Sequence, residues 1–74
     1  MKGILILCGV ALPNHPFASH CEDGTTIRSK TDSIGRLFAP CPWVTFRYSG
    51  VVLASKIEKG RAEARCDEFI VRRK

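Results

Sequence analysis

The most informative absences in this 74-residue sequence concern catalytic and nucleotide-binding motifs. None of the six glycines precedes a Lys-Ser or Lys-Thr pair, which excludes a phosphate loop of the Walker kind. No Gly-x-Ser-x-Gly segment is present, so the nucleophile elbow of many hydrolases is also excluded. The two histidines lie in a proline-rich stretch, with no obvious nucleophile beside them. We therefore expect a protein that is not an enzyme and that uses no cofactor.

Long apolar runs are also missing, because a membrane-spanning helix needs about 20 apolar residues and the longest run covers only residues 3–12. With Lys2 before it, this run resembles the first part of a secretion signal, so one alternative is a secreted, disulfide-containing protein with residues 1–20 as signal peptide. Two observations argue against it. Ala18 and Ser19 are adjacent rather than spaced as a cleavage site requires, and cleavage would leave an odd number of cysteines. We expect a cytoplasmic protein without a membrane span.

The cysteines lack the Cys-x-x-Cys spacing that most zinc ribbons and redox motifs need. Free, mostly buried thiols in a reducing compartment are therefore the favoured interpretation, and no metal ligand is assigned. An alternative is a small zinc-bound interaction module, in which two of His15, His20 and Cys21 supply ligands together with Cys41 or Cys66. The four cysteines are Cys8, Cys21, Cys41 and Cys66.

Apolar patterning predicts several strands within one small domain, residues 1–74. Residues 4–12 favour a strand buried on both faces, and Pro13 and Pro16 a turn after it. Asp23-Gly24 indicates a hairpin between residues 17–21 and 25–28. Residues 43–48 alternate clearly and turn at Ser49-Gly50 into a partner strand, residues 51–57. Residues 31–38 form a loop or a short helix capped by Asp32 or Ser33.

A helix is expected over residues 58–73. Ala62, Cys66, Phe69 and Ile70 recur at the spacing of one helical face, and Gly60 would lie at the helix start. Glu68 and Arg72 would form an i,i+4 pair on this helix. The predicted fold class is α+β, a small and mostly antiparallel sheet of three to four strands covered by this C-terminal helix.

Basic residues outnumber acidic ones, twelve to seven, which gives a net charge of +5 and favours an anionic partner. We expect a small binding or regulatory protein with nucleic acid as the leading partner, through the outer surface of the helix with Trp43 and Tyr48 nearby. A protein partner is the second choice, and a homodimer closed through an edge strand is a further alternative. An ordinary solvated helix face, balanced by Glu63, Asp67 and Glu68, is the competing interpretation. The candidate nucleic-acid-binding residues are Arg47, Lys56, Lys59, Arg61, Arg65, Arg72 and Arg73.

The order of elements over residues 43–71, with Lys-Gly-Arg-Ala-Glu-Ala at the helix start, loosely resembles the closing hairpin and helix of double-stranded-RNA-binding domains. It resembles small prophage proteins equally. The sequence departs from the RNA-binding pattern in two ways. Lys59 stands alone where that family has paired lysines, and an apolar strand replaces the family's first helix. No family is assigned on this basis.

Overall fold

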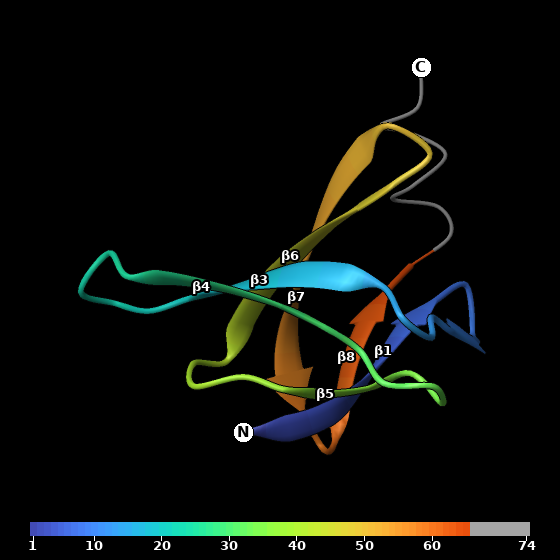
Figure 1. Cartoon of the computed structure of the whole chain (residues 1–74), viewed down its shortest axis with the longest axis horizontal. Coiled ribbons are helices and arrows are strands. Elements are labelled where there is room, and N and C mark those ends of the chain that lie inside the picture. The colour runs from blue at the N-terminus through green and yellow to red at the C-terminus, as the bar shows by residue number, and fades with distance from the viewer. Residues whose placement is uncertain (66–74) are drawn as a thin grey trace.

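A computed structural model of the chain describes residues 1–65, which form eight strands and no helix (Figure 1). The strands are β1 (Lys2–Leu7), β2 (Val10–Ala11), β3 (Pro16–His20), β4 (Thr26–Lys30), β5 (Arg36–Phe38), β6 (Trp43–Tyr48), β7 (Val51–Glu58) and β8 (Arg61–Ala64). Their order in the sheet is β2-β1-β8-β7-β6-β3-β4, with β5 paired to β1 off this path. Only the β1–β8 pair is parallel among these strands. The sheet curls into a half-barrel, so the predicted α+β class is wrong.

The predicted helix over residues 58–73 is wrong wherever the structure describes it. Ala62 and Ala64 are buried while Arg61 and Glu63 are exposed, and this period of two is that of a strand. The alanines pack in a sheet because β8 lies between β1 and β7. Without the helix, the resemblance to RNA-binding domains is lost as well. The other residues of the expected helix, including Cys66, Phe69, Ile70 and the pair Glu68 and Arg72, lie outside the described residues.

The turn at Lys59-Gly60 explains why the chain reverses here instead of starting a helix. Lys59 has φ of 52° and Gly60 φ of 75°, and two successive positive φ values define the type I′ turn of two-residue hairpins. Glu58 therefore pairs with Arg61 directly across the loop. Cys8-Gly9 and Ser49-Gly50 form turns of the same kind, which end β1 and β6.

Both expected hairpins are confirmed. β6 covers residues 43–48 as predicted and pairs with β7 in the expected register about Ser49-Gly50. The Asp23-Gly24 hairpin is also present as β3 and β4. The first strand is shorter than expected, because the chain turns at Cys8-Gly9, and it alternates between buried and half-buried residues instead of being buried on both faces.

The core lies on the inner face of the curled sheet. Its largest fully buried side chains are Leu5, Leu37, Leu53 and Val44. Ser19, also fully buried, satisfies its hydroxyl by donating to the carbonyl of Cys41, 3.0 Å away, and by accepting from the Cys41 backbone N–H. Burial of a hydroxyl is tolerated because both of its hydrogen-bonding roles are used.

A disulfide joins Cys21, at the end of β3, to Cys41, just before β6. Cys8 is disulfide-bonded too, and no described cysteine is a free thiol. The expectation of free thiols is therefore wrong. Because their sulfurs are bonded to each other, Cys21 and Cys41 have no thiolate to offer a metal.

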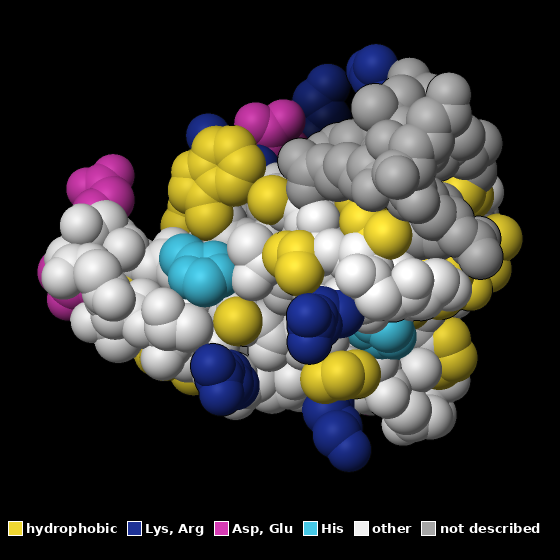
Figure 2. Space-filling view, turned by 90° about the horizontal axis from the view of Figure 1, so that it is seen from above, with side chains coloured by type: hydrophobic (Ala, Val, Ile, Leu, Met, Phe, Trp, Pro, Cys, Tyr) yellow, Lys and Arg dark blue, Asp and Glu magenta, His cyan; other side chains and the backbone are white. Residues whose placement is uncertain are grey.

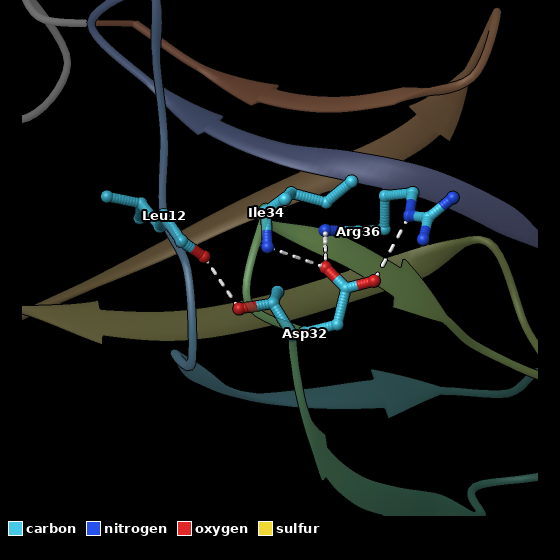
Figure 3. A network of polar contacts seen from close by, with 5 residues as sticks. Leu12, Asp32, Ile34 and Arg36 are labelled. Atoms are coloured by element: carbon cyan, nitrogen blue, oxygen red, sulfur yellow. Dashed lines mark hydrogen bonds and ion pairs between the residues drawn. The ribbon is translucent and has the colours of Figure 1, made fainter.

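Asp32 shapes the sharp bend between β4 and β5 that brings β5 back to β1 (Figure 3). Its Oδ1 accepts backbone N–H bonds from Ile34 and Arg36, and its Oδ2 accepts from Arg36 Nε at 3.1 Å. Beside it, the Thr31 hydroxyl donates to the carbonyl of Leu12. Residues 31–38 were expected as a loop or as a short helix capped by Asp32 or Ser33. The structure has a turn followed by β5, and Asp32 caps the turn because its carboxylate accepts from free N–H groups there.

Residues 1–20 form an integral part of this fold. They contain β1, β2 and β3, with Leu5, Leu7, Phe17 and Ser19 buried in the core. Removing them would take three strands from the sheet. Within residues 1–65 there is no helix long and apolar enough to cross a membrane.

Candidate nucleic-acid interface

The outer face of the sheet follows from the alternation of β6. Val44 and Phe46 point into the core, so Trp43, Thr45 and Arg47 point to the opposite side. Strand pairing extends this face on both flanks. In β3 it continues through Ala18 and His20, and in β7 through Ala54 and Lys56.

Trp43 is the exposed aromatic residue of this face on β6, at the first position of the strand. Its side chain is 53% exposed, and it lies directly across from His20 on one neighbouring strand and Lys56 on the other. The exposed ring is therefore available for contact with a ligand, between a histidine and a lysine.

Hydroxyl groups hold the His20 ring beside Trp43. The His20 Nε2 lies 2.7 Å from the hydroxyl oxygen of Thr45 on β6, and Nδ1 lies 3.3 Å from that of Thr26 on β4. With both ring nitrogens engaged by neighbouring strands, the imidazole is fixed in the plane of the face. Trp43 therefore has one rigid neighbour.

The structure brings together only part of the predicted basic set. Lys56, Lys59, Arg61 and Arg65 line one groove of about 300 Å³ on β7 and β8, but Glu58 and Glu63 line it as well. Lys56 Nζ lies 3.8 Å from Glu58 Oε1, so part of the positive charge is neutralised there. Arg72 and Arg73 lie outside the described residues.

Arg47 belongs to a different groove, of about 390 Å³, on β3, β4 and β6. There it faces Arg28, which the sequence had not assigned to the site, across a floor that includes Pro16 and Ala18. The sequence held one signal that could have placed Arg28 on this face. The Asp23-Gly24 turn sets the register of the hairpin, and that register pairs Arg28 with Ala18. We call this the arginine groove.

Tyr48 does not join Trp43, contrary to expectation. By the alternation of β6, Tyr48 lies on the same side of the strand as Val44 and Phe46. Its ring centroid lies 6.1 Å from that of His15. His15 in turn contacts Phe46 edge to face, at 5.7 Å between centroids, and its Nε2 lies 2.7 Å from the Arg47 carbonyl oxygen. This cluster stabilises the far end of β6 and leaves Trp43 as the aromatic residue of the outer face on β6.

The described residues offer no metal site, since nowhere among them do three His, Cys, Asp or Glu side chains gather to hold an ion. His15 and His20, proposed as zinc ligands with Cys21, instead bond to a backbone carbonyl and to threonines. In the view of Figure 2, Lys and Arg side chains are interspersed with hydrophobic and histidine side chains, and acidic side chains lie toward the margin. Such a surface suits binding of an extended anion better than chemistry on a small substrate.

Comparison with family models, with curated proteins and with solved structures finds no match for this chain.

Proposed function

We propose that the protein binds single-stranded nucleic acid, without catalysing a reaction, through the outer face of β3, β4, β6 and β7 centred on Trp43. The observation that carries the proposal is the exposed indole of Trp43, with Lys56 directly across and Arg47 on its own strand. Exposed aromatic rings stack on bases, and surrounding cations contact phosphates. The face replaces the C-terminal helix that the sequence suggested as the binding surface.

Single strands fit this face better than duplexes because stacking on Trp43 requires an unpaired base with an open ring face. The basic residues would contribute affinity without sequence preference. The net charge of +5 supports the same class of partner by drawing polyanions toward the protein.

Trp43 is the only tryptophan in the chain, so intrinsic fluorescence reports on the proposed site alone. We expect an oligothymidylate of about 12 nucleotides to quench this fluorescence with micromolar affinity at low salt, and the affinity to fall steeply as salt rises. Duplex DNA and duplex RNA serve as comparisons and should bind more weakly. Absence of oligonucleotide binding at low salt would overturn the proposal.

A matched pair of variants separates stacking from general apolar exposure. Trp43→Ala should weaken oligothymidylate binding about tenfold, measured by anisotropy of a labelled oligonucleotide, since stacking contributes about 1 to 3 kcal/mol per base. Phe38→Ala is the control, because Phe38 is 66% exposed but lies on β5, with Lys2 Nζ 5.7 Å from its ring centroid. Equal losses in the two variants would argue against a Trp43 site.

The compartment is a separate proposal, supported by the disulfide. Stable disulfides are rare in the reducing cytosol, so the Cys21–Cys41 bond supports an oxidising compartment over the cytoplasm, with residues 1–20 retained because they carry three strands of the sheet. Mass analysis after thiol alkylation of protein isolated from its native cells tests it. A Cys21–Cys41 pair that is fully alkylated without prior reduction would return the protein to a reducing compartment.

A protein partner is the second candidate, favoured by the edge strand β4. All five residues from Thr26 to Lys30 are exposed, and β4 ends the strand order. An added strand could pair there, and Arg28 and Lys30 would favour an acidic one over a second copy of β4. Sedimentation equilibrium that shows a monomer would remove the homodimer alternative.

A further inference from the structure

Strand pairing brings two arginines to the two sides of the arginine groove. Arg28 on β4 pairs with Ala18 on β3, and Arg47 on β6 comes one residue after Phe46, which pairs with Phe17. The two arginines therefore lie on the strands that flank β3, two residues apart in register and about 12 Å apart in backbone position. Their side chains line one groove, so guanidinium groups from both sides can reach a single anion between them.

Small residues leave the space between the arginines open. Ala18 on β3 pairs with Arg28 on one side and with Thr45 on the other. Pro16, two residues earlier on β3, lies on the same face. A methyl group on the groove floor lets an anion approach the sheet, where a longer side chain would fill the groove.

The electrostatics of the arginine groove differ from those of the β7–β8 groove. Among residues 1–65, no acidic residue lines it, whereas Glu58 and Glu63 line the other. Arg28 and Arg47 form no ion pair with any residue of the described part of the chain, where Arg36–Asp32 and Lys56–Glu58 are the pairs present. Both guanidinium groups therefore keep their full donor capacity for a ligand.

We propose that Arg28 and Arg47 together bind one phosphate group of a nucleic-acid backbone, with Ala18 beneath it. This inference rests on the proposed function and adds the path of the strand. Arg47 lies four residues along β6 from Trp43, or about 13 Å. A strand stacked on Trp43 and His20 would run past Thr45 to the arginine groove, roughly parallel to β6.

The first test changes the two arginines and a matched pair elsewhere. Arg28→Gln with Arg47→Gln should lower oligothymidylate affinity at least tenfold at low salt and reduce the slope of log affinity against log salt by about 0.7, as expected for one lost phosphate contact. The control, Lys59→Gln with Arg61→Gln, removes the same charge from the groove lined by glutamates and should lower affinity less than threefold. Equal losses in both double variants would overturn the paired site.

The second test needs no nucleic acid. Titration of the wild-type protein with inorganic pyrophosphate, followed by NMR of the arginine Nε–H groups, should move the Arg28 and Arg47 signals together with one saturation curve. Uniform small shifts of all arginines would overturn the proposal. Loss of Trp43 quenching with the pyrophosphate response intact would contradict the proposed function while leaving the anion site in place. Quenching that persists in the Arg28→Gln, Arg47→Gln variant at unchanged affinity would contradict the anion site while leaving the proposed function in place.

Discussion

Asp32 shows how much one exposed carboxylate can organise. The N–H of Arg36 is the largest of the influences that lower its pKa, with further contributions from Ile34 and the Arg36 guanidinium. Because the folded state prefers the ionised form, the stabilisation is present above the ordinary pKa of 3.8 and is lost as the pH falls through the lowered value. The same holds for Asp23, whose pKa is lowered mainly by the Thr25 N–H.

The first prediction follows from the lowered pKa of Asp32. Asp32→Asn keeps an acceptor at Oδ1 but has no charge to titrate, so it should lower the melting temperature at pH 7 and make little difference near pH 2.5. The measurement is thermal unfolding across that pH range, and Asp23→Asn should behave in the same way. A difference between wild type and Asp32→Asn that stays constant down to pH 2.5 would contradict the assigned cause.

Leu53 marks the centre of the core, with no exposed surface. Leu53→Ala should lower the free energy of unfolding by about 2 to 5 kcal/mol, from lost burial and the cavity left behind. In a domain of this size that loss is large enough to unfold much of the population. Val10→Ala is the control, since Val10 is 62% exposed, and should change stability by less than about 0.5 kcal/mol. Urea unfolding measures both, and similar losses would contradict the placement of the core.

At the scale of elements, the turn between β7 and β8 decides the fold of the last described segment. Gly60→Ala should destabilise the protein by about 1 to 2 kcal/mol, because alanine is strained at φ of 75°. Lys59→Asn should have the opposite sign, since asparagine tolerates positive φ better than lysine. Urea unfolding of the two variants checks both signs. A neutral Gly60→Ala would mean that this hairpin turn is not formed.

For the whole molecule, the Cys21–Cys41 disulfide links the β3–β4 hairpin to the segment before β6. With a sequence separation of 20, the chain-entropy model gives about 3 kcal/mol of stabilisation. Cys21→Ala with Cys41→Ala should therefore lower the free energy of unfolding by about that amount in guanidinium titrations. A loss below about 0.5 kcal/mol would show that the loop is already constrained without the bond.

Local signals in the sequence determined much of this protein. Alternation at residues 43–48, the Ser49-Gly50 turn and the Asp23-Gly24 turn predict two hairpins, which the structure confirms. Each of these features depends on residues close together in the chain, whose turn geometry and side-chain parity are fixed locally. The excess of basic residues is likewise a property of the sequence alone.

Only the tertiary structure decided the rest, because the deciding contacts join residues far apart in the sequence. Residues 61–64 suit a helix by composition, since alanine is the best helix former, but parallel pairing with β1 places Ile4 beside Arg61 and makes them a strand. Four cysteines allow three pairings, and only the fold selects Cys21 with Cys41. The arginine groove has the same origin, because β3 must lie between β4 and β6 before Arg28 and Arg47 can face one another.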